Sequence, residues 1–275
     1  MSEPISVSSV RTAAESAPQA DAFSLSAKDA ISSAKPVSAA ETISRAEMDA
    51  FFDVMQPFKE LMMYYECAIL EVRTKVEVLD KEFSVRYQRD PVESIKTRLK
   101  SPLSIVEKMR RKGLPLRLDT LERSIHDVAG IRIVCSFVDD IYAVANLLTS
   151  QDDITLLETK DYIKNPKPNG YRSLHLLVGI PIFLSSGKKE MCVEVQIRTV
   201  AMDFWASTEH KIKYKKDIAD RENVTNRLRI CAEKVAALDL EMQEIGREIA
   251  REQNELTGQE EPFRRTPLFH DEAAE

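Results

Sequence analysis

The chain has 275 residues, of which 43% are hydrophobic and 31% are charged, a balance typical of globular proteins with one large domain or two small ones. Its formal net charge of −6 argues against a protein that coats nucleic acid, although a local basic pocket is compatible with that charge. The four cysteines are scattered without a CxxC pair, so we expect reduced thiols and no zinc site. The N-terminus lacks a basic start followed by an apolar core, and no apolar run has membrane-spanning length, so we expect no signal peptide, no membrane contact and a cytoplasmic location.

The N-terminal part predicts a tail followed by a long helix. Residues 1–43 are rich in Ser, Ala and Pro and have few large apolar side chains, so we predict a disordered tail. Ser44 and Glu47 have the spacing of a capping box. Apolar residues then recur at alternating steps of three and four up to Phe83, which is a heptad pattern, and Pro57 is expected to break or kink this helix.

The central part alternates short strands and helices. Alternation and β-branched residues predict strands at 94–100, 129–136, 154–160, 172–180 and 189–198. Helices are predicted from Ser101 to Gly113, at Asp119, from Asp139 and over 200–216. We expect the last of these helices, which carries Trp205, to be structural. Together these elements predict an α+β domain with a mixed β-sheet of about five strands and surrounding helices.

A second heptad-patterned helix is predicted from about 223 to 251, followed by a loose tail at 257–275. The ordered domain therefore extends over 44–256, with a heptad-patterned helix at each end. These two helices either pack on each other or on the sheet, or they form the interface of a homo-oligomer.

The segment DYIKNPKPNGYRSLH, 161–175, combines a cation, an amide, an aromatic ring and an imidazole in Lys167, Asn169, Tyr171 and His175. Asn169-Gly170 predicts a turn because both residues tolerate positive φ. The strand that follows has His175 on one face and leucines on the other. A cation and a stacking ring at the mouth of a sheet suit a nucleotide better than an apolar ligand.

Two further motifs contribute acidic residues. In VEVQIRT, alternation places Glu194, Gln196 and Arg198 on one face of a strand, where Glu194 is either a structural acid paired with Arg198 or a metal ligand. In HDVAGIRI, Asp127 precedes a strand, and Gly130 is expected to permit a close backbone approach. An isolated loop aspartate is ordinary, but two carboxylates together with several cations and planar groups suit Mg²⁺ and nucleotide phosphates.

These motifs, with RLKSPLSIVEKMRRKG, resemble those of the RelA/SpoT-homologue alarmone synthetases, in the family's order, from about residue 95 to 215. The chain looks like a small, synthetase-only member with a nucleotidyltransferase-like synthetase fold. The sequence contains the dipeptide His-Asp at 126–127 and at 270–271, and this dipeptide resembles the metal-binding dyad of the family's hydrolase domain. Asp127 already belongs to the synthetase motif and His270 lies in the predicted tail, so no hydrolase domain fits.

The resemblance implies roles for the matching residues. Those implied to bind ATP are Arg98, Lys100, Ser104, Lys108 and Arg132, with Arg98 and Arg132 stacking on the two faces of adenine. Those implied to bind GTP or GDP are Lys160, Lys167, Asn169, Tyr171, His175, Gln196 and Arg198, with Tyr171 stacking on guanine. Asp127 and Glu194 would hold Mg²⁺, and Glu194 would also activate the attacking hydroxyl as a base or as a metal-bound orienting group.

The implied reaction, part of the stringent response, transfers the β,γ-pyrophosphate of ATP to the 3′-hydroxyl of GDP or GTP, giving AMP and ppGpp or pppGpp. The resemblance also favours a homo-oligomer, a tetramer. One alternative is a toxic relative that pyrophosphorylates tRNA or makes adenosine alarmones. Another is a non-catalytic regulator that binds guanine nucleotides or single-stranded RNA, and RNA binding is also compatible with catalysis. The sequence has no G-x-x-x-x-G-K-[ST], which argues against a P-loop NTPase.

Overall fold

The computed structural model describes residues 45–87, 89–213 and 220–257. The chain divides into two compact units, 1–52 and 53–275, and the described structure belongs to the second unit apart from the first turns of helix α2 (Arg45–Tyr87). The predicted N-terminal tail, the capping box at Ser44 and nearly all of the predicted C-terminal tail lie outside the described residues.

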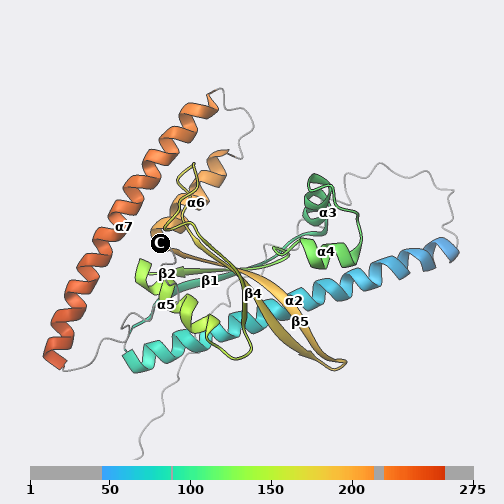
Figure 1. Cartoon of the computed structure of the whole chain (residues 1–275), viewed down its shortest axis with the longest axis horizontal. Coiled ribbons are helices and arrows are strands. Elements are labelled where there is room, and N and C mark those ends of the chain that lie inside the picture. Colours follow the sequence, from blue (N-terminus) through green and yellow to red (C-terminus); the bar gives the residue numbers. More distant parts are fainter. Residues whose placement is uncertain (1–44, 88, 214–219, 258–275) are drawn as a thin grey trace, which may run out of the picture. The chain divides into compact units, whose positions relative to one another are not determined.

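Five strands form one mixed sheet in the order β1-β2-β5-β4-β3 (Figure 1). Their bounds are Val92–Leu99 for β1, Ala129–Cys135 for β2, Thr155–Asp161 for β3, Leu174–Leu184 for β4 and Gly187–Thr199 for β5. The pair β2–β5 is parallel and the other three pairs are antiparallel. The five-strand mixed sheet with surrounding helices confirms the α+β prediction.

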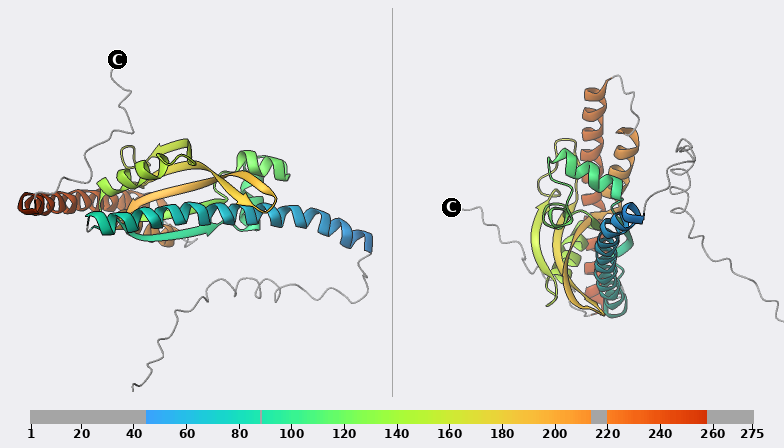
Figure 2. Two further views of the ribbon diagram at one scale, coloured as in Figure 1. Left: turned by 90° about the horizontal axis from the view of Figure 1, so that it is seen from below. Right: turned by 90° about the vertical axis from the view of Figure 1, so that its right-hand side faces the viewer.

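One face of the sheet forms the core. Inward residues alternate along each strand, as in Ile131 and Ile133 of β2 and Val193, Val195 and Ile197 of β5, all at most 2% exposed. Helices α2 and α5 (Val138–Thr149) pack their apolar residues into the same core. Figure 2 shows α2 running along this side of the sheet. Because these helices fill the apolar face, the opposite face carries the polar residues.

The long helix α2 continues through Pro57, so the predicted alternative of a break is wrong, and a kink stays a prediction. Proline removes one backbone donor. The turns that follow are fixed by Leu61, Tyr65 and Ile69, which are buried against the core. This part of the heptad pattern therefore serves packing within the unit.

Two short helices follow β1. Helix α3 (Pro102–Arg111) begins as predicted, because the Ser101 hydroxyl accepts a hydrogen bond from the Ser104 amide at 3.3 Å. Helix α4 (Leu118–Ser124) has Arg117 at its N-cap position, without a side-chain cap hydrogen bond, and Asp119 lies in its first turn. The helix therefore begins next to the predicted Asp119, whose charge suits that end of a helix.

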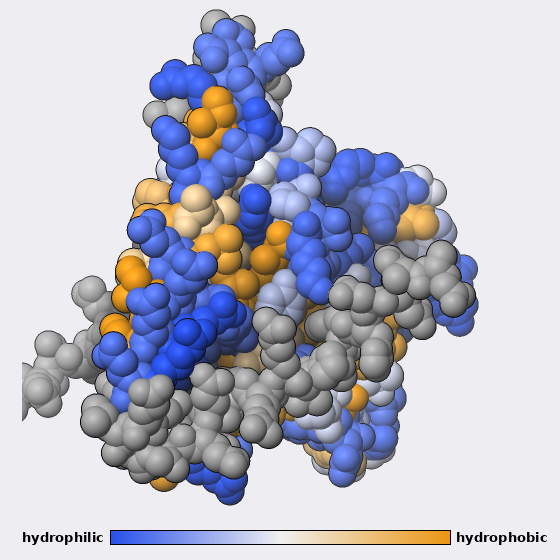
Figure 3. Space-filling model, turned by 60° about the vertical axis from the view of Figure 1, so that its left-hand side comes forward, coloured by the Kyte–Doolittle hydropathy of each residue, from blue (hydrophilic) through white to orange (hydrophobic). Residues whose placement is uncertain are grey.

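Helices α6 (Val200–Lys213) and α7 (Arg221–Thr257) lie side by side (Figure 1). Trp205 of α6 packs on Leu228 and Ala232 of α7, and its indole donates to the Leu228 carbonyl at 3.0 Å. Farther along α7 the apolar row becomes exposed at Leu238, Met242, Ile245 and Ile249. Figure 3 shows hydrophobic patches among hydrophilic ones on the side of the molecule that carries α7. No helix of the described residues is both long and apolar enough to cross a membrane.

Candidate functional site

The polar face of the sheet carries a row of side chains that crosses all five strands. Residues in cross-strand register form this row in the order Lys96, Arg132, Gln196, His175 and Lys160. The neighbouring row contains Arg98, Gly130 and Glu194. Six of the predicted site residues, with Lys96 and Gly130 beside them, thus lie in two adjacent rows because the strands pair in this register.

The predicted turn before β4 is a closed loop. The Gly170 amide donates to the Lys167 carbonyl at 2.8 Å, and the Lys167 amide donates to the Tyr171 carbonyl at 3.2 Å. Gly170 has φ +90°, and a Cβ there would lie 2.5 Å from the Ala232 side chain. Glycine is therefore needed both for the turn and for the close approach of α7, which fixes the loop.

The Lys167 ammonium lies over two aromatic rings, 4.4 Å from the centroid of Tyr162 and 4.8 Å from that of Tyr171. Such contacts hold the cation at the loop while leaving it able to meet an anion. The Asn169 side chain donates to Glu209 of α6 at 3.1 Å and accepts from the Tyr171 amide. The loop residues are therefore oriented before a ligand arrives.

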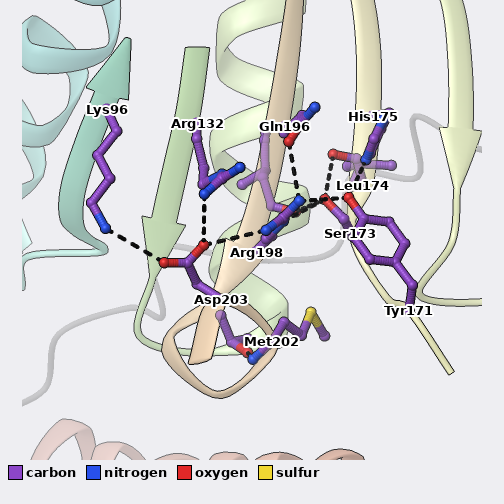
Figure 4. A network of polar contacts seen from close by, with 12 residues as sticks. Lys96, Arg132, Tyr171, Ser173, Leu174, His175, Gln196, Arg198, Met202 and Asp203 are labelled. Atoms are coloured by element: carbon purple, nitrogen blue, oxygen red, sulfur yellow. Dashed lines mark hydrogen bonds and ion pairs between the residues drawn. The ribbon is translucent and has the colours of Figure 1, made fainter. Parts of the chain in front are cut away.

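Tyr171 connects the loop to the sheet. Its hydroxyl lies 2.7 Å from His175 Nε2 and accepts from Arg198 Nη2 at 2.6 Å (Figure 4). Arg198 also lies 5.0 Å from the centroid of the tyrosine ring. The hydroxyl thus holds the ring in place.

Glu194 pairs with His175 and Gln196, so the predicted alternative of a pair with Arg198 is wrong. His175 Nδ1 lies 3.4 Å from Glu194 Oε1, and the Gln196 amide donates to Oε2 at 3.1 Å. The hydrogen bond with His175 lowers the pKa of Glu194 below its usual 4.5, although burial opposes this. Glu194 is therefore an ionised carboxylate at neutral pH.

Arg198, which is almost fully buried, forms its ion pair with Asp203 in the first turn of α6 at 3.3 Å. Asp203 also contacts Arg132 at 3.3 Å and Lys96 at 3.5 Å (Figure 4). The helix that we expected to be structural therefore contributes a carboxylate to the site as well as packing through Trp205.

Asp127 lies beside the ATP motif. Lys100 and Lys108 both contact its Oδ2, at 2.8 and 2.7 Å. Burial alone would raise the pKa of Asp127, but the two lysines outweigh it and lower the pKa. Its buried Oδ1 finds no hydrogen-bond partner among the described residues. This carboxylate therefore retains an oxygen that a cation could use.

Gly130 does not serve a close approach between two segments of the protein, and a close approach to a ligand stays a prediction. A Cβ at Gly130 would lie at an ordinary 3.6 Å from the Arg98 carbonyl. The missing side chain instead leaves the polar face open between Arg98 and Glu194, which flank it in register. Arg98 and Arg132 share this face on adjacent strands, two residues apart in register.

Two predicted residues have hydrogen-bonding or ion-pair partners close to them in the chain. Lys160 pairs with Glu158 at 2.8 Å, and the Ser104 hydroxyl is bonded to Ser101. Sequence reasoning missed Tyr162, Asp203 and Glu209, which contact the predicted residues. Two signals were available: Tyr162 lies inside the motif segment, and Asp203 and Glu209 are acidic residues in the predicted helix that directly follows the VEVQIRT strand.

Comparisons with known proteins agree with this arrangement. Residues 97–219 match the family model described as a region found in RelA / SpoT proteins. GTP pyrophosphokinase YwaC of Bacillus subtilis (strain 168) is 41% identical over 207 residues, which are 75% of this chain and 99% of the relative. GTP pyrophosphokinase YjbM of the same organism is 39% identical over 197 residues, 71% of this chain and 92% of the relative.

Solved structures of small alarmone synthetases are similar to this chain in fold and sequence. Small alarmone synthetase 1 from Bacillus subtilis bound to its product pppGpp has a TM-score of 0.64 and 39% identity, covering 70% of this chain and 98% of that one. The same protein bound to AMPCPP has a TM-score of 0.60 and 36% identity, covering 71% and 99%. Small alarmone synthetase 2 from Bacillus subtilis has a TM-score of 0.63 and 42% identity, covering 70% and 98%.

Proposed function

The chain belongs to the RelA/SpoT family as a small alarmone synthetase, and we propose that it transfers the β,γ-pyrophosphate of ATP to the 3′-hydroxyl of GDP or GTP. The observation that carries this assignment is the polar face of the sheet. It combines cations for phosphates, planar groups for bases and two carboxylates on a fold shared with proteins named GTP pyrophosphokinases. Such a site catalyses transfer mainly by positioning and charge neutralisation.

We assign ATP to the side of β1, β2 and α3. The residues proposed to bind ATP are Arg98, Lys100, Ser104, Lys108 and Arg132. Lys100 and Lys108 both contact Asp127, and a triphosphate would offer them a more highly charged anion. ATP binding would draw the lysines to phosphate and release the Asp127 carboxylate.

We assign the guanosine nucleotide to the side of β4, β5 and the loop before β4. The residues proposed to bind it are Lys160, Lys167, Asn169, Tyr171, His175, Gln196 and Arg198. Lys167 above the tyrosine rings provides a phosphate-binding cation, and Tyr171 provides a stacking surface for guanine. Lys160 lies at the outer end of the row and is half-exposed, so its contribution is electrostatic.

The two carboxylates fit a magnesium ion. Asp127 has an unused buried oxygen, and Glu194 is ionised and electrostatically coupled to Asp127. The described residues form no cluster of three or more His, Cys, Asp or Glu that could hold a metal, so water and phosphate oxygens would complete the shell, as Mg²⁺ prefers. When bound, Mg²⁺ neutralises charge on the phosphates.

We propose that Glu194 orients the attacking 3′-hydroxyl by accepting its hydrogen bond. A lowered pKa makes a carboxylate a weak base, whereas a general base works best with a pKa near the operating pH. The role of a cation ligand and hydrogen-bond acceptor therefore fits Glu194 better than that of a strong base.

We also propose that the exposed apolar row of α7, formed by Leu238, Met242, Ile245 and Ile249, contacts a second copy of the chain in a homo-oligomer. These side chains are 46–56% exposed and share one flank of the helix. A tetramer, a cytoplasmic location and the ordered domain limits of 44–256 stay predictions.

The test is product analysis after incubation with ATP, Mg²⁺ and one acceptor at a time, either GDP, GTP or tRNA. Formation of AMP with ppGpp or pppGpp supports the proposal. Consumption of ATP with tRNA alone would instead support the tRNA-modifying alternative, and no transfer to any acceptor would favour a nucleotide-binding regulator.

A further inference from the structure

Asp203 lies where cations from three strands converge (Figure 4). Its Oδ1 is 3.3 Å from Arg132 Nη1 and 3.3 Å from Arg198 Nη1, and its Oδ2 is 3.5 Å from Lys96 Nζ. The side chain of Asp203 is 13% exposed and that of Arg198 is 5% exposed. Water therefore screens the contact between these two groups only weakly.

The shared carboxylate matters because the two arginines repel each other. Burial and the charge of Arg198 lower the pKa of Arg132, while Asp203 acts in the opposite direction. Two guanidinium groups on adjacent strands would separate without an anion between them. Asp203 therefore sets the distance between Arg132 and Arg198 before any phosphate arrives.

The backbone of Asp203 is anchored from outside the nucleotide site. The Thr199 hydroxyl accepts from the Met202 amide at 3.1 Å and donates to Asp239 of α7 at 2.5 Å. Thr199 and Asp239 are both buried. The first turn of α6 also favours an anion through the helix dipole. The position of Asp203 is thus set by contacts outside the site, and the arginines orient towards its carboxylate.

We propose that Asp203 is a positioning residue that holds Arg132 and Arg198 in register and so couples the ATP side of the site to the guanosine side. The inference rests on the proposed function, which assigns these arginines to different nucleotides. Arg198 continues to the Tyr171 hydroxyl at 2.6 Å, so the polar chain from Arg132 reaches the guanosine loop. Asp203 acts through the arginines and does not itself contact a substrate.

The opposite role would be competition, in which Asp203 occupies the arginines and phosphate must displace it. The two roles predict opposite changes in nucleotide affinity when the carboxylate is removed. Loss of a positioning carboxylate weakens binding of both nucleotides, whereas loss of a competing carboxylate strengthens it. An effect on both nucleotides also separates coupling from a local contact with one of them.

The test is Asp203→Asn, which keeps the size of the side chain and removes its charge. The measurements are KM for ATP and for GDP, together with Kd for AMPCPP alone and for GDP alone by calorimetry. We expect each KM and each Kd to rise about tenfold or more. Asp203→Glu, which restores the charge, should recover part of the loss. The control Asp153→Asn removes a surface carboxylate paired with Lys75 at 2.7 Å and should leave all four values unchanged.

Unchanged or lower values for Asp203→Asn would overturn the proposal, as would a rise for only one nucleotide. A lower kcat with both KM values unchanged would also overturn it, because that result indicates a merely structural role. A wild-type protein that binds both nucleotides but makes no product would refute the proposed function alone, since the two Kd values still test Asp203.

Discussion

Tyr171 allows ring stacking and hydrogen bonding to be tested separately, because its hydroxyl can be removed while its ring is kept. The ring faces Lys167 and Arg198, whereas the hydroxyl contacts His175 and Arg198. Tyr171→Ala removes both parts, and Tyr171→Phe removes the hydroxyl alone. The pair of variants therefore measures each part in turn.

The magnitudes follow from these contacts. Stacking of a base on an aromatic side chain contributes about 1–3 kcal/mol, so Tyr171→Ala should raise KM for GDP by roughly 5- to 150-fold. A hydrogen bond to a charged group contributes about 1.5–3 kcal/mol. Because the hydroxyl lies at 2.6 Å from nearly buried Arg198, Tyr171→Phe should lower the stability of the fold by about 1.5–3 kcal/mol, while KM for GDP rises less than about tenfold.

The assay is steady-state synthesis with ATP and GDP varied in turn, and thermal unfolding reports stability. KM for ATP should change much less than KM for GDP in Tyr171→Ala. Equal losses for both nucleotides would refute the stacking role. A Tyr171→Phe variant as defective towards GDP as Tyr171→Ala would show that the hydroxyl and not the ring binds the nucleotide.

Glu194→Gln should abolish synthesis while circular dichroism shows a retained fold, and residual turnover near the wild-type rate would remove Glu194 from the mechanism. The pKa of Glu194 in the folded state is lowered from 4.5, so its pairing stabilises the fold above pH 4.5, and this stabilisation is lost as the pH falls through the lowered pKa. The acid limb of the kcat/KM profile should therefore lie below pH 4.5. An acid limb at about pH 6 would contradict this assignment. Leu238→Glu combined with Ile245→Glu should lower the mass in light scattering, whereas the control Leu240→Glu, on the opposite flank of α7, should not; an unchanged mass for the double variant would exclude the α7 interface.

The strands, and the polar side chains that share one face of a strand, could be predicted because alternation is a local property of the sequence. Glu194, Gln196 and Arg198 share one face, as the period of two requires. The turn at Gly170 was predictable from its residue type, but its contact with Ala232 was not, because α7 lies more than fifty residues farther along the chain.

The hydrogen-bonding and ion-pair partners of the site residues could not be predicted, because these partners come from other strands and helices. The sequence offered Arg198 as one possible partner of Glu194, yet the register places His175 opposite Gln196, and Nδ1 of that histidine reaches Glu194. Asp203 was missed because α6 folds back at the end of β5 and brings its first turn onto the arginines. Helical periodicity predicts the buried face of such a helix but not which charged group its first turn will meet.

Transfer of pyrophosphate from ATP to a guanosine nucleotide is tested most directly by following label position. The measurement uses ATP labelled at either the γ- or the α-phosphate, with Mg²⁺ and GDP, in parallel with Glu194→Gln. The wild-type protein should place γ-label in ppGpp and leave α-label in AMP, and Glu194→Gln should do neither. α-Label in the guanosine product would show adenylyl transfer, and γ-label released only as free phosphate would show hydrolysis; either result would contradict a pyrophosphokinase.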